Sequence, residues 1–238
     1  MQHRALAASL LVLAAFAAGT VDARGHLQTR QTRVELPAGI RAGRLVLANS
    51  GDAPVAAQVR VYRWTQRDGE DVLEPDTSIV PSPQVVEIDA GGEQLVRLVR
   101  SSTAAVANEQ AYRVVVDELP GDPAKDATSA VAVRLRYLVP MFVRAANAAP
   151  EAVRCHVQGA VFACSNAGGR AAQLGASQVV DSQGKTVDLS TGLMGYVLAG
   201  STRHFPFDAD KFPARGAPRE LKVSLNGLPT TLDLAASP

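Results

Sequence analysis

Short runs of apolar residues alternate with turn-forming residues along most of the chain. Within the runs, apolar and polar side chains follow one another at a period close to two, which is typical of β-strands with one buried face. Apolar residues almost nowhere recur at the spacing of a helix. The pattern predicts an all-β protein, with strands before residue 145 at Arg33–Leu36, Arg44–Ala48, Val55–Tyr62, Val85–Ile88, Gln94–Arg100, Tyr112–Leu119 and Ala130–Val143.

Turn signals divide these runs at regular intervals. The clusters Asn49–Asp52, Gln66–Glu70 and Asp89–Gly92 are rich in residues that favour turn conformations. Strands that follow one another about every 8 to 12 residues, with turns between them, are expected of an antiparallel β-sandwich. The first part of the chain is therefore predicted to form such a sandwich.

A small, proline-terminated segment, Asn147–Pro150, follows the longest extended run and is typical of a linker. We therefore predict one domain at residues 24–146 and a second at residues 147–238. The strand signals of the second domain are weaker, with a turn at Asp181–Gly184. Besides a cysteine hairpin they comprise Ala171–Leu174, Gln178–Val180, Tyr196–Leu198 and Glu220–Leu225.

The first residues are typical of a secretory signal peptide. Arg4 precedes an uncharged apolar run from Ala5 to Ala18, and small residues follow up to Ala23. The run is short for a membrane-spanning helix, so residues 1–23 are predicted to be cleaved, with a retained anchor helix as the alternative. No later apolar stretch is long enough to cross a bilayer. We therefore expect an exported protein.

Length and charge limit the function classes. Cleavage would leave about 215 residues, a natural size for two domains of roughly 100 residues each. The chain carries 24 Lys+Arg against 23 Asp+Glu, a net charge of +1, so no global field attracts nucleic acid or an anionic surface. We expect no nucleic-acid partner, and any function that depends on charge must be local.

The two cysteines, Cys155 and Cys164, lie close together in the sequence. The segment between them resembles a hairpin with a turn near Gly159-Ala160, which would place the two cysteines opposite each other. An oxidising compartment lets a disulfide persist, so we predict that they form one. Metal binding is the alternative, but His156 alone adds too few ligands for a four-coordinate zinc site.

The sequence contains no recognisable catalytic or cofactor motif. His26, His156 and His204 are scattered, with no carboxylate or cysteine at a catalytic spacing. There is no Gly-x-Ser-x-Gly elbow, phosphate-binding glycine loop, His-Glu-x-x-His motif or calcium loop. We predict a binding protein without catalytic activity, cofactor or metal. A catalytic triad assembled in space would escape this search, so an exported enzyme stays as a remote alternative.

The run Ala130–Pro140 is unusual because it is long and apolar on one face. Val131, Val133 and Leu135 share that face. The last strand of a sandwich is usually at a sheet edge, where free backbone groups pair with another chain by β-augmentation. The alternative is a core strand that its own sheets cover completely.

Two arginines lie in the outermost strands of the predicted sandwich. Arg33 is near the start of its first strand, and Arg136 is in its last strand. If those strands are neighbours, the two guanidinium groups would converge on a carboxylate. Charge-assisted hydrogen bonds of this kind contribute about 1.5 to 3 kcal/mol each when shielded from water. The alternative for each is an ordinary surface arginine.

Several short stretches of the chain, taken in the order in which they occur, resemble the PapD-like periplasmic chaperones of the chaperone-usher pathway, in particular their archaic-type branch. The resemblance covers nearly all of the mature chain. The residues that carry it are Thr32-Arg33-Val34, Asn49–Asp52, Trp64-Thr65-Gln66, Asp68–Asp71, Ser82-Pro83, Ala90–Gly92, Gln94–Arg97, Glu109, Tyr112, Asp117–Pro120, Arg136–Pro140, Cys164–Gly168 and Gly195–Gly200.

The resemblance implies two immunoglobulin-like β-sandwich domains in an L or boomerang arrangement. It implies a periplasmic chaperone that donates an edge strand to incomplete pilus subunits and delivers them to an outer-membrane usher. Arg33 and Arg136 would anchor the carboxylate at the C-terminus of the subunit. Val131, Val133 and Leu135 would fill its open groove. The same edge would allow the unbound protein to self-associate.

The sequence departs from the family pattern in three places. Leu135 stands where well-studied members carry a lysine, so the second anchor, Arg136, is shifted by one residue. Glu109 matches a signature glutamate, but Val115 replaces a later asparagine, and Val139 replaces an arginine before the final proline. The alternative to a chaperone is a secreted immunoglobulin-like adhesin or ligand-binding module, which the low aromatic content of 5% does not favour.

Overall fold

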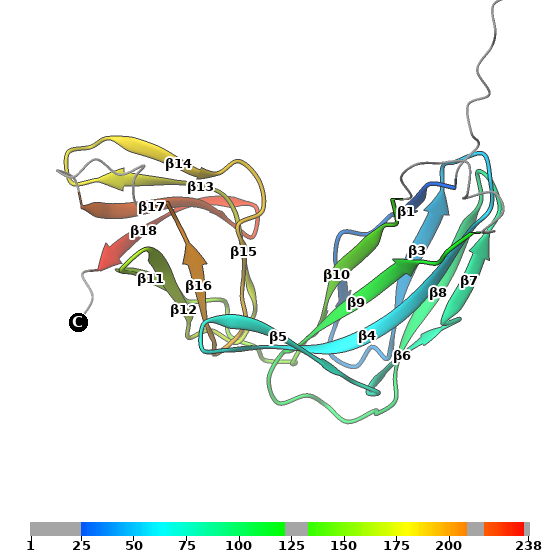
Figure 1. Cartoon of the computed structure of the whole chain (residues 1–238). Helices are drawn as coiled ribbons and strands as arrows, with labels where there is room; N and C mark the ends of the chain where they lie inside the picture. The colour runs from blue at the N-terminus through cyan, green and yellow to red at the C-terminus, as the bar shows by residue number, and fades with distance from the viewer. Residues whose placement is uncertain (1–24, 122–132, 209–216, 236–238) are drawn as a thin grey trace, which may run out of the picture.

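The computed structural model describes residues 25–121, 133–208 and 217–235, which fold into two β-sandwich domains set at an angle (Figure 1). The secondary structure of these residues consists of strands and turns, so the predicted all-β class is confirmed. None of the described residues forms a helix of the length and apolarity needed to cross a membrane. The predicted signal peptide, residues 1–23, lies outside the described residues.

Two sheets form the first domain, and each contains strands that are far apart in the sequence. The smaller sheet has the order β1-β3-β8-β6. The larger has the order β2-β10-β9-β4-β5, and β7 also pairs with β4. Their bounds are β1 Leu27–Thr29, β2 Val34–Leu36, β3 Ala42–Asn49, β4 Val55–Arg67, β5 Glu70–Pro75, β6 Ile79–Ser82, β7 Val85–Ile88, β8 Glu93–Arg100, β9 Gln110–Glu118 and β10 Arg136–Val143.

Alternation along the strands of the larger sheet separates its two faces. In β9, Tyr112, Val114 and Val116 point into the core between the sheets, where they are almost fully buried. Arg113 and Asp117 therefore lie on the opposite face, which looks toward the second domain. We call this opposite face of the larger sheet the cleft face.

The second domain contains two layers that share β18. The strand order is β14-β13-β17-β18-β11-β12-β16, with β15 also paired to β13. A separate core of buried side chains fills it, with Phe162, Leu174 and Leu221 fully buried. The bounds are β11 Val153–Gln158, β12 Val161–Asn166, β13 Ala172–Asp181, β14 Thr186–Ser190, β15 Gly195–Val197, β16 Thr202–Pro206, β17 Pro218–Leu225 and β18 Leu228–Ala235.

The last strand of the first domain differs from its prediction in two ways. Among the described residues it begins at Arg136, and Val133–Leu135 before it are not part of the strand, whereas residues 130–132 lie outside the described residues. Its partner β9 ends at Glu118, and the chain then reaches Pro120, which has no N–H to donate. It is also an edge over only part of its length. Met141–Val143 pair in parallel with Val34–Leu36 of β2, whereas no strand among the described residues pairs with Arg136–Pro140 on that side.

The predicted boundary between residues 146 and 147 falls between the end of β10 at Val143 and the start of β11 at Val153. It stays a prediction, since the strands alone do not say where one folding unit ends.

Candidate functional site

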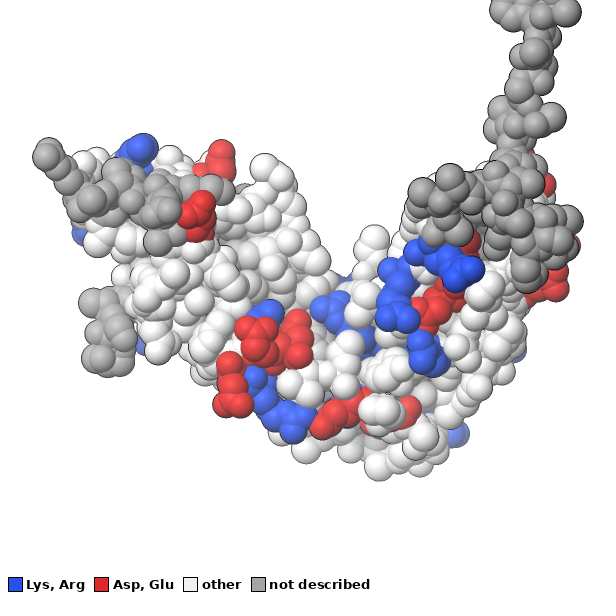
Figure 2. All heavy atoms as spheres, viewed as in Figure 1, with Lys and Arg blue, Asp and Glu red and all other residues white. Residues whose placement is uncertain are grey.

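The open edge of β10 lies along the hollow between the two domains, which we call the cleft (Figure 2). Lys and Arg side chains gather on the wall of this hollow that the first domain forms. On the cleft face β10 presents Arg136, Leu138, Pro140 and Phe142 in alternation. Leu138 is 48% exposed even though it is aliphatic. The cleft therefore combines an unpaired strand edge, an exposed apolar side chain and several cations.

Strand register places Arg33 beside Arg113, a residue that the sequence did not single out. Arg33 directly precedes Val34, whose partner in β10 is Met141, so Arg33 lies next to Pro140. The partner of Pro140 in β9 is Arg113. Arg33, Pro140 and Arg113 thus form one row across the cleft face.

The guanidinium of Arg113 is held against the aromatic side chains at the bottom of the cleft. Its central carbon lies 3.6 Å from the centroid of the Trp64 ring and 5.5 Å from that of Tyr196. Burial lowers the pKa of Arg113, although the side chain still carries its charge at neutral pH. No carboxylate among the described residues lies within ion-pair distance of it. Arg113 is thus a partly dehydrated cation that forms no ion pair within the described residues, although the charge of Asp71 acts on it from a longer distance.

The structure does not bring the guanidinium groups of Arg33 and Arg136 together. Arg136 and Pro140 are four positions apart in β10, about 13 Å along the strand. Each arginine also has its own carboxylate. Arg33 pairs with Glu35 at 2.6 Å, and Arg136 pairs with Asp117.

Asp117 lies between Arg60 and Arg136 and forms an ion pair with each. Burial alone would raise the pKa of Asp117, but the hydrogen bonds from Arg60 and Arg136 outweigh it and hold that pKa below its usual range. The neighbouring Glu118 accepts a hydrogen bond from the backbone N–H of Leu135 at 3.1 Å. The acidic end of β9 therefore fixes the point at which β10 begins.

A second chain of charges leads from the cleft into the joint between the domains. Glu35 accepts from both Arg33 and Arg144, and Arg144 also pairs with Glu109. The carboxylate of Glu109 then accepts the backbone N–H of Ala171 in the second domain at 2.7 Å. Burial raises the pKa of Glu109, and the bonds from Ala171 and Arg144 oppose that shift. The glutamate singled out in the sequence thus links the domains, with Arg144 as its cation.

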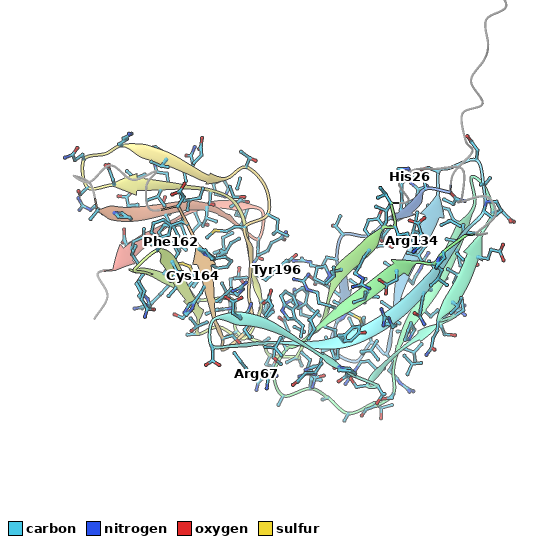
Figure 3. The ribbon with its side chains drawn as sticks, in the orientation of Figure 1. His26, Arg67, Arg134, Phe162, Cys164 and Tyr196 are labelled. Carbon is cyan, nitrogen blue, oxygen red and sulfur yellow. A yellow bond between two sulfur atoms is a disulfide. The ribbon has the colours of Figure 1, made fainter. Side chains whose placement is uncertain are left out.

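Aromatic side chains from both domains close the bottom of the cleft. Trp64 and Phe142 from the first domain contact Tyr196 from the second, with ring centroids 5.4 and 5.9 Å from that of Tyr196. Figure 3 shows Tyr196 at this bend. The side-chain amide of Gln66 donates to the Tyr196 carbonyl at 2.8 Å and accepts from the Leu198 N–H at 2.9 Å. The joint is therefore both packed and hydrogen-bonded.

Two of the three predicted donor residues, Val133 and Leu135, lie just before the open edge of β10. Val133 is 71% exposed, and Leu135 is partly exposed. Val131 lies outside the described residues. The role of these side chains stays a prediction.

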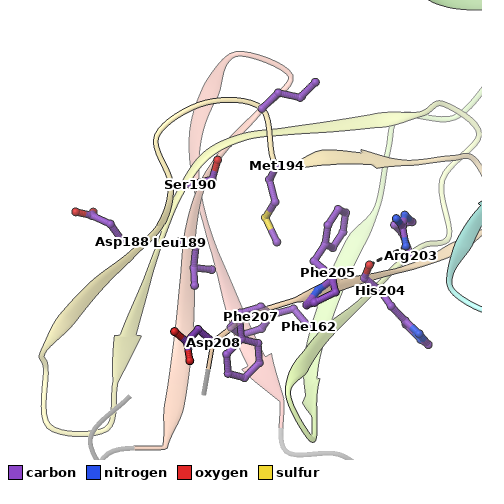
Figure 4. A pocket seen from close by; sticks show the side chains of 12 residues that line it. Phe162, Asp188, Leu189, Ser190, Met194, Arg203, His204, Phe205, Phe207 and Asp208 are labelled. Atoms are coloured by element: carbon purple, nitrogen blue, oxygen red, sulfur yellow. Dashed lines mark hydrogen bonds between the residues drawn. The ribbon is translucent and has the colours of Figure 1, made fainter. Parts of the chain in front are cut away.

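The cysteine hairpin has the predicted form. Cys155 in β11 is opposite Cys164 in β12, and the two form a disulfide. Nearby, Phe162, Met194 and Phe205 help to line a cavity of about 390 Å³, whose lining also includes polar side chains such as Asp188 and Ser190 (Figure 4). This cavity is part of the second domain and contains none of the predicted site residues. Within the described residues, no group of three or more His, Cys, Asp or Glu side chains is placed to hold a metal ion.

Comparison with known proteins identifies the family. Residues 26–149 match the family described as "Pili and flagellar-assembly chaperone, PapD N-terminal domain". The chain belongs to this family. The family predicted from the sequence is thereby confirmed, it is a family of chaperones, and an adhesin or other ligand-binding module is not favoured. No curated protein matches the sequence.

Solved structures of chaperones share the fold over most of the chain. A chain of the CsuC-CsuE chaperone-tip adhesion subunit complex, from archaic chaperone-usher Csu pili of Acinetobacter baumannii, is 24% identical with a TM-score of 0.66. The alignment covers 91% of this protein and 100% of that chain. The likeness shows a shared fold.

Two further structures show the same likeness. A chain of the Salmonella enterica SafA pilin and SafB chaperone complex is 16% identical, with a TM-score of 0.63 and coverage of 88% of this protein and 96% of that chain. The CupB2 chaperone of Pseudomonas aeruginosa is 16% identical, with a TM-score of 0.58 and coverage of 87% and 100%. The predicted pair of immunoglobulin-like sandwiches is confirmed.

Arg113 is the site residue that the sequence prediction missed. A signal was present, because Arg113 and Asp117 are charged residues four apart in a strand whose other face is apolar. The parallel pairing of β2 with β10 places Arg33 in the row of Arg113, and this pairing could not be predicted from the sequence.

Proposed function

We propose that this pilus chaperone binds incomplete subunits in the cleft by donating the open edge of β10 to them. The observation that carries the proposal is the position of that unpaired edge, Arg136–Pro140, next to the guanidinium of Arg113, which has no ion-pair partner among the described residues. A strand of the subunit would pair with β10, and its C-terminal carboxylate would reach the cations at the bottom of the cleft.

In this proposal Arg33 and Arg113 form the main carboxylate anchor. Their side chains share one row of the cleft face. Burial raises the pKa of Tyr196, and the charges of Arg33 and Arg113 both oppose that shift, so both cations lie near the same ring. Arg136 remains the second anchor predicted from the sequence. Its pairing with Asp117 favours a different role, in which it holds the first residue of β10 in register.

Affinity and register would come from different groups. Each aliphatic side chain that becomes fully buried contributes about 1.5 to 3 kcal/mol, so Val131, Val133 and Leu135 together would exceed one exposed ion pair. A carboxylate bound to the cations at the bottom of the cleft would fix which subunit residue faces which residue of β10. Hydrophobic burial would supply the affinity, and the arginines the register.

The setting of this activity is also part of the proposal. The predicted signal peptide, the disulfide and the family together support a location in the periplasm. The complexes named among the similar structures join chaperones to a tip adhesion subunit and to a pilin. We infer that this protein likewise holds pilus subunits and passes them to an outer-membrane usher, and that it acts by binding, without catalysis.

A double-mutant cycle tests the anchor. Arg33→Ala, Arg113→Ala and Arg136→Ala are each titrated with a pilus subunit from the same gene cluster, once with its native C-terminus and once with a short C-terminal extension. For Arg113→Ala we expect about tenfold or greater weakening with the native subunit, and little further weakening with the extended one, because the two changes remove the same bond.

Arg97→Ala is the matched control, since Arg97 is exposed on β8 in the other sheet. Additive effects of Arg113→Ala and the extension would refute its role as an anchor. Non-additive effects confined to Arg136→Ala would instead support the anchor predicted from the sequence.

A further inference from the structure

The hairpin of β4 and β5 projects beyond its own sheet toward the second domain (Figure 1). The last residue of β4 that pairs with β9 is Trp64. Beyond Trp64, β4 forms strand pairs only with β5, as a two-stranded ribbon. A two-stranded ribbon is marginally stable on its own. Its tip therefore needs support from elsewhere.

That support comes from β16 of the second domain. The carbonyl of Gly69, in the turn of the hairpin, accepts the backbone N–H of His204 at 2.9 Å. It also accepts a hydrogen bond from the guanidinium of Arg203. Arg203 in turn pairs with Glu70 at 2.9 Å and lies 3.7 Å from Asp71. One mostly buried arginine thus binds three successive residues of the tip.

Gly69 is the residue that makes this contact possible. Its φ of +78° suits glycine, and a Cβ added there would lie 2.2 Å from Nδ1 and 2.3 Å from Cγ of His204. The imidazole of His204 therefore lies directly against the backbone of Gly69. Figure 4 shows this ring directed away from the cavity of the second domain.

The tip contact lies away from the aromatic joint. Gly69 is five residues beyond Trp64 along the ribbon, about 15 Å if fully extended. If the aromatic joint were the one contact between the domains, they could rotate about it. A second contact at a distance, at the tip of the hairpin, opposes that rotation. We propose that the β4–β5 hairpin is a strut that sets the angle between the domains, with Gly69 and Arg203 as its positioning residues.

This inference rests on the proposed function. The angle between the domains affects binding only if the subunit is bound between them. If loosening the strut leaves the binding-competent angle populated about a third to a tenth of the time, apparent affinity for the subunit falls about three- to tenfold.

The test measures the angle and the binding separately. Spin labels at Thr103→Cys and Lys222→Cys, both exposed and in different domains, report the distance between the domains in the full mature chain. Gly69→Ala and Arg203→Ala are compared with wild type. We expect both to broaden or shift the distance distribution and to weaken subunit binding about three- to tenfold.

Matched controls separate the strut from local strain. Gly91→Ala places a Cβ at a similar φ of +69° with nothing within 4 Å, and Arg154→Ala removes an exposed arginine of the second domain. Both should leave distance and binding unchanged. Adding His204→Ala to Gly69→Ala removes the clashing ring and should restore part of the wild-type distribution.

Unchanged distance distributions in Gly69→Ala and Arg203→Ala would overturn the strut. If instead the distributions change but wild type binds no subunit, the strut stands and the proposed function fails.

Discussion

Arg113 and Asp117 lie four residues apart in β9 on the cleft face, yet their surroundings give them opposite roles. The charge of Asp117 is neutralised within the domain, because Arg60 and Arg136 each form an ion pair with it. Arg113 stacks on Trp64 and has no carboxylate of its own among the described residues. One residue therefore holds the strands together, and the other is the one that we propose binds the subunit.

Asp117 should make the stability of the first domain depend on pH. Its folded pKa is lower than the ordinary value of about 3.9, so its contribution is complete above that pH and is lost as the pH falls through the folded pKa. We expect Asp117→Asn to lower the melting temperature at pH 7, and the gap to wild type to shrink toward pH 3.

Thermal unfolding at both pH values makes the measurement. Asp52→Asn, at an exposed turn position, is the control. A gap that stays constant or grows on acidification would contradict the role assigned to the Arg60 and Arg136 bonds.

At the scale of elements, the two ends of β10 have different surroundings. Its C-terminal end is buried between β2 and β9, with Met141 and Val143 in the core. Its N-terminal end is open on one side and leads back to the exposed Val133. The same strand is thus anchored in its own domain and available to another chain.

Polar substitution just before the open edge should weaken binding without unfolding the protein. Because Val133 is 71% exposed, Val133→Asp should leave the melting temperature nearly unchanged. Loss of a buried aliphatic side chain in the complex should weaken subunit binding about tenfold or more. Val80→Asp, on β6 of the other sheet and 41% exposed, is the control. Equal binding by all three proteins would contradict strand donation at this position.

The β11–β12 hairpin is an element whose disulfide should act on stability alone. Replacing both Cys155 and Cys164 by Ala should lower the free energy of unfolding by about 2 to 4 kcal/mol, since the bond restricts the unfolded chain. Urea denaturation measures the change, and reduced wild type should behave like the variant. A subunit affinity that falls at a temperature where the variant is fully folded would contradict a purely structural role.

Features specified by neighbouring residues were predictable from the sequence, and features specified by distant pairings were not. Asp68 and Gly69 form the expected turn because both adopt positive φ, and the cysteines meet because one short turn separates them. The start of β10 at Arg136 depends on where β9 stops, and the row of Arg33 and Arg113 depends on the parallel pairing of β2. Such contacts leave no local pattern in the sequence. Arg33 and Arg136 were therefore predicted as cations of the site, and Arg113 was not.

For the molecule as a whole, the link between the domains determines whether the cleft is a site at all. Trp64, Phe142 and Tyr196 form one apolar joint, and the Glu109 carboxylate adds a hydrogen bond to the backbone of the second domain. These contacts join the wall of cations to the domain that faces it. The cleft would therefore be present before a subunit arrives, which reduces the ordering that binding requires.

The central claim is that the protein completes an incomplete subunit with its own strand. The most direct measurement is a calorimetric titration of the mature chain with one pilus subunit in two forms, the natural form and a form that carries its missing strand fused to its end. We predict a one-to-one complex with the natural form and no measurable binding to the completed form. Equal binding to both forms, or binding to neither, would contradict the account.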